Sequence, residues 1–374
     1  MEYRHGGDIY GENKIILDFS VNTNPLSMPE SVKREVLAHP EDFCRYPDSG
    51  CRKLRQALSG FYENQYGGRA EFSPEDFICG NGAADILYSL VFAMRPKKAL
   101  LCEPTFGEYE EALKAAGCEI VKIDRGEDGL PPEDLDMVIL CNPNNPTGSV
   151  FSQSEMKKWL DFCGSRGIFL VIDECFNWFL SEPEKHSVAS RLGNYENVFL
   201  LNAFTKIYAM AGLRLGYGIC KNKNILKRIE GCRQPWSVSG AAMRGGIEAL
   251  KDLAFLERTR ETVAKERSYL AGELKKLGFE VFPSEVNFLL FRCRDGVDYY
   301  GFCRQRGILI RSCHNFDGLD YGCYRVGVKL RKENEALLAC LAEGRKSGGK
   351  GNYDTGDHVK CRKESSGGGT LPDL

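Results

Sequence analysis

The sequence predicts an α/β fold with two parts: a large domain whose mostly parallel sheet is covered by helices, and a smaller α+β domain. Two observations predict this fold. Short apolar runs alternate with longer amphipathic stretches through the middle of the chain, which is typical of parallel strands buried between helices. From about Gly240 this alternation gives way to one long charged stretch followed by short apolar runs, which indicates a second unit.

The expected strands of the large domain are apolar runs that end in turn-forming or polar residues. They lie within residues 97–104, 136–143, 168–174, 197–204 and 213–220. Helical patterns fill some of the intervals, over 106–116 and 153–166. Turn-forming residues such as Pro143 and Gly148 follow the strands. Open α/β sheets bind ligands at such strand exits, so functional residues are expected there.

The expected domain boundaries follow the same pattern. Residues 1–45 are loop-rich and are expected to form an N-terminal arm and part of the smaller domain, and residues 46–240 the large domain. Residues 241–343 are expected to form a linking helix, over 241–277, and the rest of the smaller domain. Its expected strands lie within 286–293, 307–313 and 324–330. The tail, 344–374, is rich in Gly, Lys and Ser and is expected to be disordered, because it has too little apolar surface to bury.

Composition excludes several classes of protein. The 374 residues carry a net charge of −2 with both signs mixed, so we expect no nucleic-acid surface. The 16 cysteines are scattered, with no C-x-x-C pair, which favours free, mostly buried thiols in a reducing compartment over zinc sites or a disulfide framework. No segment approaches eighteen uninterrupted apolar residues, so we expect no membrane contact and a cytoplasmic protein.

The segment NAFTKIYAMAGLRLGYG places Lys206 directly after an expected strand, among Phe204, Ile207 and Tyr208. Apolar surroundings destabilise the charged amine, so its pKa falls and it becomes a usable nucleophile. The alternative is a lysine at a strand edge whose charged end reaches solvent. Arg214, eight residues further on, is a candidate cation for an anion bound beside this lysine.

Asp173 ends the apolar strand in IFLVIDECFNWF. A carboxylate at such a position needs a cationic partner or pays a large desolvation cost. A pyridinium nitrogen is one such partner, and cofactor enzymes use an acid in that role. The alternative is a strand-end aspartate that caps the next helix.

Two further turns also follow expected strands. CNPNNPTGSVFS contains Asn145 and presents amide groups at the edge of the sheet, although an ordinary rigid turn has the same composition. In ICGNGAADILYSL, the small residues Gly82 and Ala83 lead into a helix, whose free N–H groups can hold a phosphate.

This set of motifs resembles the fold type I pyridoxal phosphate (PLP) enzymes of the aspartate aminotransferase superfamily, over most of the chain. The resemblance implies that Lys206 carries PLP as a Schiff base and that Asp173 pairs with the pyridine nitrogen. It also implies that Tyr109 stacks on the ring, and that Tyr208 and Asn145 bind the ring's 3-hydroxyl oxygen.

The resemblance further implies a phosphate site and a homodimer with shared active sites. The phosphate ligands of the same chain are Thr205, Arg214 and the backbone of Gly82 and Ala83. Tyr46 of the partner subunit completes the site. Many relatives carry a hydroxyl residue where this chain has Ala203, so we expect weaker cofactor retention.

Two branches of this superfamily are similar to the chain: histidinol-phosphate aminotransferases and threonine-phosphate decarboxylases. The blocks RHGGDIYGENKIILDFSVNTNP, RQPWSVS and ILIRSCHNFDGLDYGCYRVGVK look more like the second branch. The substrate contacts that this likeness implies are His5, Gly6, Asn22, Asn145, Arg311 and Arg325. The alternatives are a frayed terminal residue for His5 and a structural salt bridge for Arg311.

The implied substrate is a small phosphorylated amino acid, since two arginines and a histidine suit a molecule with both carboxylate and phosphate. The decarboxylase branch implies conversion of L-threonine O-3-phosphate to (R)-1-aminopropan-2-yl phosphate for the cobalamin side chain. The alternative is transamination with 2-oxoglutarate, and the choice depends on which bond of the substrate stands perpendicular to the cofactor plane. A non-enzymatic regulator of the same fold is expected to carry a basic helix-turn-helix, for which this sequence offers no candidate.

Overall fold

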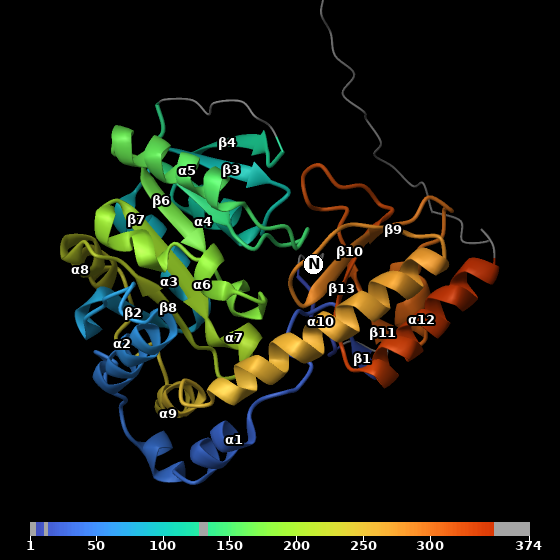
Figure 1. Cartoon of the computed structure of the whole chain (residues 1–374), viewed down its shortest axis with the longest axis horizontal. Coiled ribbons are helices and arrows are strands. Elements are labelled where there is room, and N and C mark those ends of the chain that lie inside the picture. Colours follow the sequence, from blue (N-terminus) through green and yellow to red (C-terminus); the bar gives the residue numbers. More distant parts are fainter. Residues whose placement is uncertain (1–4, 11–13, 127–133, 348–374) are drawn as a thin grey trace, which may run out of the picture.

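The structure is a computed structural model that describes residues 5–10, 14–126 and 134–347. Its described part forms two units, and helix α10 (Leu253–Lys276) runs from one to the other (Figure 1). None of the helices within these ranges is both long and apolar enough to span a bilayer. The cysteines described are all free, and all but Cys44 and Cys232 are buried, which confirms the expectation of free, mostly buried thiols.

The larger unit is built on a seven-stranded sheet with the order β2-β8-β7-β6-β5-β3-β4. Its strands are β2 (Phe77–Gly80), β3 (Lys98–Glu103), β4 (Glu119–Asp124), β5 (Met137–Cys141), β6 (Phe169–Asp173), β7 (Val198–Ala203) and β8 (Gly216–Ile219). Strand β8 runs in the opposite direction to the other six strands of this sheet. The residues that follow β2, β5, β6 and β7 therefore lie at the same edge of the sheet, together with the residues that precede β8.

Helices cover both faces of this sheet, as expected. Leu170 and Leu200 belong to one apolar core, whereas their neighbours Val171 and Leu201 belong to the other, because successive side chains of a strand point to opposite faces. The first core includes side chains of α2 (Arg52–Tyr66), α5 (Gln153–Arg166) and α9 (Gly240–Ala249). The second includes side chains of α3 (Gly82–Met94), α4 (Glu108–Ala115) and α8 (Lys223–Gly231).

The smaller unit contains an antiparallel sheet with the order β12-β13-β10-β9 and a parallel pair of β1 with β11. The strands are β1 (Leu17–Asp18), β9 (Glu280–Val281), β10 (Phe288–Arg292), β11 (Ile308–Leu309), β12 (Arg311–Ser312) and β13 (Cys323–Gly327). The core of this unit joins Phe19 to apolar side chains of α10, α11 (Tyr299–Gln305) and α12 (Arg331–Lys346).

Three expectations about the fold were wrong in detail. The single linking helix over 241–277 is two helices, α9 and α10, because the side chain of Asp252 accepts the N–H of Phe255 and starts a new helix there. Residues 344–346, expected to be disordered, extend α12, since Gly344 packs against Phe302 and Tyr299. Residues 348–374 lie outside the described residues.

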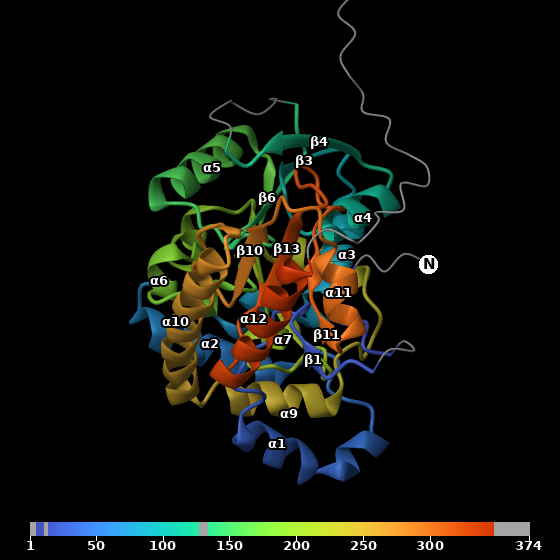
Figure 2. The ribbon, with the colours of Figure 1, turned by 90° about the vertical axis from the view of Figure 1, so that its right-hand side faces the viewer.

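The third correction concerns the N-terminal arm. Residues 16–19 pack on the smaller unit as expected, through the pairing of β1 with β11. Helix α1 (Glu30–Leu37) instead lies against α9 on the larger unit (Figure 2). There Val32 and Val36 contact the helix beside Gly245, whose missing side chain allows the close approach.

Candidate active site

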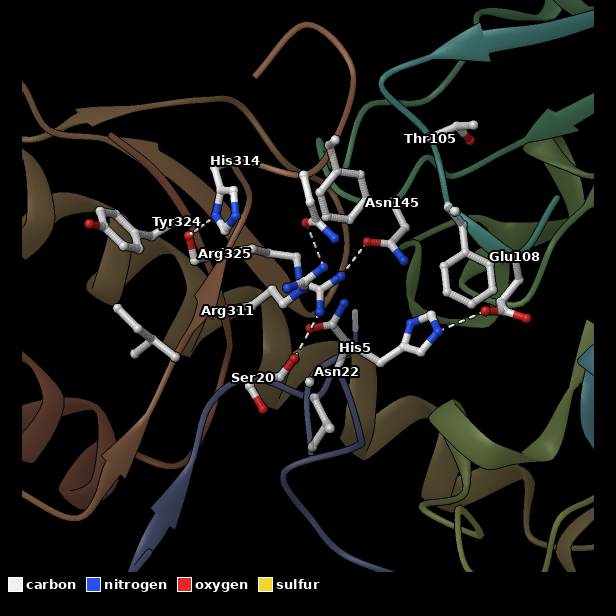
Figure 3. Close-up of a pocket in the computed structure, with 18 of the residues that line it drawn as sticks. His5, Ser20, Asn22, Thr105, Glu108, Asn145, Arg311, His314, Tyr324 and Arg325 are labelled. Carbon is white, nitrogen blue, oxygen red and sulfur yellow. Dashed lines mark hydrogen bonds and ion pairs between the residues drawn. The ribbon is translucent and has the colours of Figure 1, made fainter. Parts of the chain in front are cut away.

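The motifs singled out in the sequence meet at one edge of the large sheet. Gly82 follows β2, Asn145 follows β5, Asp173 ends β6, and Lys206 follows β7. Beside this edge, a cavity of about 1100 Å³ lies between the two units. The predicted residues that line it are Lys206 and Asn145 of the larger unit, Arg311 and Arg325 of the smaller unit, and His5, Gly6 and Asn22 of the arm. Figure 3 shows Asn145, Arg311, Arg325, His5 and Asn22 around this cavity.

Lys206 lies on α7 (Phe204–Ile207), a short helix directly after β7. The backbone N–H of Asn24 donates to the Lys206 carbonyl at 3.0 Å, which joins the arm to this turn. Burial lowers the pKa of the Lys206 amine from 10.5 to about 8, and the positive charges of Arg325 and Arg214 lower it further within that total. The expected fall in pKa is thus confirmed, and the amine is available as a nucleophile near neutral pH.

The lowered pKa of Lys206 predicts how covalent attachment of an aldehyde depends on pH. Only the neutral amine attacks the aldehyde. The rate of PLP attachment to cofactor-free protein should therefore rise through a midpoint near pH 8, which is the lowered pKa of Lys206, and not near 10.5. Arg325→Ala removes a neighbouring cation and should move the midpoint to higher pH, whereas Arg306→Ala, at an exposed site, should not. Stopped-flow absorbance measures the rate, and a midpoint above pH 10 in the unmodified protein would contradict the environment described for Lys206.

Asp173 presents a buried carboxylate to the same edge. Its side chain is 6% exposed. Oδ1 accepts the backbone N–H of Cys175 at 2.9 Å, and Oδ2 accepts the hydroxyl of Tyr109 at 2.6 Å. Burial, followed by the charge of Asp173, raises the pKa of Tyr109, so this hydroxyl stays protonated and donates. Within the described residues neither partner of Asp173 is a cation, so the carboxylate fits a ligand that brings a positive nitrogen.

The start of α3 and Arg214 form a cradle for an anion. Gly82 has a φ of +81°, and a Cβ added there would lie 2.6 Å from Arg214 Nη2. A Cβ on Gly216 would lie 2.5 Å from the backbone nitrogen of Ala83. These close approaches bring a guanidinium group to the free N–H groups of a helix N-terminus, which together bind phosphate. Thr205 is buried in α7, beside Lys206.

The residues at this edge therefore fit PLP. Lys206 would supply the amine for the aldehyde group, Asp173 the carboxylate for the pyridinium nitrogen, and Arg214 with the start of α3 the site for the phosphate. Thr205 and Ala83 stay predictions as phosphate ligands, and Tyr109, which contacts Asp173, stays a prediction as the residue stacked on the ring.

The structure does not bring Tyr208 to the cavity. Its ring packs against Phe204 and Phe255, at centroid distances of 5.5 and 6.1 Å, and its hydroxyl has no hydrogen-bond partner among the described residues. Because Tyr208 follows the short turn of α7, its side chain enters the core beside α10. The expectation that this hydroxyl binds the cofactor ring is therefore not supported by the geometry.

Tyr46 also lies away from the cavity of its own chain, but in a way that fits its predicted role. Its side chain is 82% exposed and its ring lies 4.6 Å from that of Trp236, which is itself 48% exposed. Two neighbouring exposed aromatic rings are available to a second subunit. Contact with the cofactor of the partner subunit stays a prediction.

Arg325 and Arg311 bring two buried guanidinium groups from the smaller unit to the cavity. Arg325, on β13, donates to the Ser20 carbonyl at 2.8 Å and to Asn145 Oδ1, and its Nε has no partner among the described residues. Burial lowers the pKa of Arg325 to about 10, so it remains a cation at neutral pH. Arg311, on β12, donates to Asn315 Oδ1 at 2.8 Å.

The N-terminal arm closes this side of the cavity. Gly6 lies so close to Ser20 that an added Cβ would come within 2.3 Å of the Ser20 carbonyl oxygen. His5 Nε2 lies 2.7 Å from Glu108 Oε1. Asn22 is 2% exposed, and its Oδ1 has no partner among the described residues. This oxygen is available to a donor group of a bound molecule.

Sequence reasoning missed several residues of the cavity wall. Phe176 lines the cavity three residues after Asp173, with its ring 5.0 Å from that of Phe288. Glu108 was missed because its role depends on His5, which is distant in the chain. Asn315 lies four residues after Arg311, and that spacing was the one available signal.

An acidic cluster at the rim of the cavity already contains a cation. Carboxylate oxygens of Glu103, Glu110 and Asp317 lie within 4.8 Å of one another. The ammonium group of Lys122 lies 2.9 Å from Glu110 and 2.6 Å from Asp317. The cluster therefore links β4 of the larger unit to the loop that follows β12 of the smaller unit.

Comparison of the sequence with known protein families shows which family this chain belongs to. The model of the aminotransferase class I and II family matches residues 14–339, and the chain therefore belongs to this family. The predicted class, a PLP-dependent enzyme with the fold type I architecture, is confirmed by this membership.

The relatives include both branches expected from the sequence. The threonine-phosphate decarboxylase of Salmonella typhimurium is 35% identical over 358 residues, which cover 90% of this chain and 95% of that protein. The histidinol-phosphate aminotransferase of Symbiobacterium thermophilum is 30% identical over 343 residues, which cover 88% and 91%. The solved structure of the histidinol-phosphate aminotransferase from Clostridium acetobutylicum has a TM-score of 0.79 at 31% identity and covers 89% of this chain and 100% of that chain.

Proposed function

We propose that this enzyme decarboxylates L-threonine O-3-phosphate to (R)-1-aminopropan-2-yl phosphate, an amine for the cobalamin side chain. The observation that carries the proposal is the pair of buried guanidinium groups, Arg311 and Arg325, in the cavity that Lys206 lines. The hydrogen bonds described for Arg325 go to a backbone carbonyl and to a neutral amide. Arg325 is buried and its Nε has no partner among the described residues, which favours a substrate with an anionic group at this position, since a buried charge is costly unless it is paired.

The residues of the site divide the work of binding and proton transfer. When bound, PLP supplies an electron sink that weakens the bonds at the Cα atom of an amino acid. Arg325, fixed by Asn145 and by the Ser20 carbonyl, binds and orients the substrate carboxylate. Arg311 and His5 bind the phosphate. The amine of Lys206, with its pKa of about 8, can hold a proton near neutral pH and deliver it to Cα after CO₂ has left.

The relatives support the decarboxylase over the aminotransferase. The Salmonella typhimurium decarboxylase is 35% identical to the chain, whereas the Symbiobacterium thermophilum aminotransferase is 30% identical. The arm supports it as well, because His5, Gly6 and Asn22 all line the cavity. Transamination of histidinol phosphate with 2-oxoglutarate is the alternative, favoured by the structural likeness to the Clostridium acetobutylicum enzyme.

Steady-state kinetics with both substrates test the proposal. We expect kcat/KM for CO₂ release from threonine phosphate to exceed kcat/KM for histidinol phosphate with 2-oxoglutarate by at least about 100-fold, a difference of about 2.7 kcal/mol in transition-state binding. The amine product is identified by mass spectrometry. A preference for histidinol phosphate would make the enzyme an aminotransferase and would defeat the proposal.

We further propose that the active unit is a homodimer in which Tyr46 of the partner subunit completes each phosphate site. Tyr46→Phe should weaken PLP retention without changing the melting temperature of the cofactor-free protein, because the side chain is 82% exposed and supports no core. PLP release is followed by absorbance during dialysis.

Mixed dimers test the shared site directly. When Tyr46→Phe subunits are mixed with Lys206→Ala subunits, each hybrid dimer contains one site with both residues intact and one site with neither. Mixing should therefore restore strong cofactor retention and activity to the intact site, which lies on the Tyr46→Phe subunit of each hybrid dimer. A monomer that is fully active at every concentration contradicts this proposal.

A further inference from the structure

The Glu108 carboxylate lies in the wall of the cavity that Arg311 and Arg325 also line. Glu108 is in the first turn of α4, and its side chain is 21% exposed. Oε1 lies 2.7 Å from His5 Nε2, and Oε2 accepts the hydroxyl of Tyr88 at 2.9 Å. An acidic group at this position repels an anionic substrate unless a cation compensates it, so its contact with His5 requires an explanation.

The contact fixes which nitrogen of His5 remains available to a ligand. Because a carboxylate only accepts hydrogen bonds, Nε2 of His5 carries the proton that faces Glu108. The other ring nitrogen, Nδ1, makes no hydrogen bond with any of the described residues, and His5 lines the cavity. The ring lies 6.0 Å from that of Phe106, and Figure 3 shows it turned toward Glu108. Nδ1 can donate to a phosphate only if the imidazole is doubly protonated.

Tyr88 fixes the carboxylate in turn. It lies on α3, and its hydroxyl donates to the oxygen of Glu108 that His5 does not use. Burial, followed by the hydrogen bond and charge of Glu108, raises the pKa of Tyr88 to about 12, so the hydroxyl keeps its proton. Tyr88, Glu108 and His5 therefore form a chain of charge-assisted hydrogen bonds that runs from the larger unit to the arm.

The arm is tied to the carboxylate site by independent contacts. The backbone N–H of Gly7 donates to Ser20 Oγ at 2.8 Å, and the Ser20 carbonyl accepts from Arg325 at 2.8 Å. Asp8 lies 3.6 Å from Arg304 of the smaller unit. Because these contacts fix the arm at Gly7 and Asp8, the hydrogen bond with Glu108 is left to set the direction of the His5 ring.

We propose that Glu108, held by Tyr88, is a positioning residue that accepts a hydrogen bond from His5 Nε2 and so directs the imidazole ring at the phosphate group of the substrate. The inference rests on the proposed function, since it assumes a phosphorylated amino acid. Its specific consequence is that removal of the Glu108 charge weakens the binding of the phosphate group and leaves the chemical step at Cα intact.

A double-mutant cycle tests this inference on the holoenzyme. We expect Glu108→Gln and His5→Ala each to raise KM for threonine phosphate by about tenfold, the effect of losing one charge-assisted hydrogen bond, with kcat changed less than twofold. The double variant should be no worse than His5→Ala, because Glu108 acts only through His5. Tyr88→Phe should produce a smaller increase in KM in the same direction. Glu110→Gln, in the same turn of α4 but paired with Lys114 and Lys122, is the matched control.

Inorganic phosphate as a competitive inhibitor separates this inference from the proposed function. Its inhibition constant should rise in Glu108→Gln and His5→Ala with whichever amino substrate the enzyme turns over. If histidinol phosphate is the true substrate but the cycle still shows coupling, the proposed function fails and the positioning role stands. Additive effects in the cycle, or an equal loss of kcat, would overturn the positioning role even where threonine phosphate is decarboxylated.

Discussion

Lys206→Ala should lower kcat by at least about 1,000-fold. In the proposed mechanism this amine is both the covalent attachment point of the cofactor and the proton donor to Cα, and general acid–base catalysis alone contributes about 10²- to 10⁴-fold. The pKa of about 8 sets this amine apart, because burial and two arginines act on it together. Assays of CO₂ release at fixed times measure the decrease in kcat. Mass spectrometry after borohydride reduction shows whether PLP is attached to the protein.

Two control variants make this result specific. Lys206→Arg keeps a positive charge but provides no amine, so it should be as inactive as Lys206→Ala. Lys227→Ala removes an exposed lysine from α8 and should leave kcat unchanged. Attachment of PLP to a different lysine after borohydride reduction would refute the assignment of Lys206.

Arg325→Ala should lower kcat/KM by roughly 30- to 5,000-fold, since losing one partner of a buried charge pair costs about 2–5 kcal/mol. The variant also removes the donor to Asn145 and to the Ser20 carbonyl, so the arm and the turn after β5 lose a common anchor. Arg325→Lys should recover only part of the activity, because an ammonium group cannot bind a carboxylate through two parallel hydrogen bonds. Arg306→Ala, at an exposed position that pairs with Glu343, is the control.

The reaction products of the Arg325→Ala variant show whether Arg325 orients the substrate as well as binding it. If Arg325 orients the substrate carboxylate for loss of CO₂, its removal should allow abortive transamination, in which a site releases one 2-oxo acid, retains the amino group and stops. Without an added 2-oxo acid, liquid chromatography should therefore detect up to one equivalent of 2-oxo acid per site, together with progressive loss of activity. A variant that loses rate but still converts all substrate to CO₂ and amine would show that Arg325 binds without orienting.

The central strands and the positions of the reactive residues could be predicted because the signal is local. The strands β5, β6 and β7 are apolar and buried throughout, so their ends mark the edge of the sheet where Asp173 and Lys206 lie. Strand β4 was missed because it lies at the edge of the sheet and its residues are only partly buried. The short strand β2 was expected only as the strand before the turn at Gly82, and its bounds were not predicted because its four residues give a very short apolar run.

The direction of side chains could not be predicted in the same way. Tyr208 is only two residues from Lys206, but the turn of α7 places the two side chains on different sides of the chain, one in the core and one in the cavity. Helix α1 and the pair of His5 with Glu108 depend on contacts between segments distant in sequence. Periodicity and spacing in one sequence contain no information about such contacts.

The most direct test of the proposed reaction counts CO₂ per active site in the absence of any 2-oxo acid. Threonine phosphate labelled with ¹⁴C at its carboxyl carbon is incubated with the enzyme at a large molar excess of substrate, and the released CO₂ is trapped. We predict many equivalents of labelled CO₂ per Lys206, because a decarboxylase returns its cofactor unchanged after each turnover. Release of no more than one equivalent, or none, together with turnover of histidinol phosphate when 2-oxoglutarate is supplied, would contradict the decarboxylase and establish an aminotransferase.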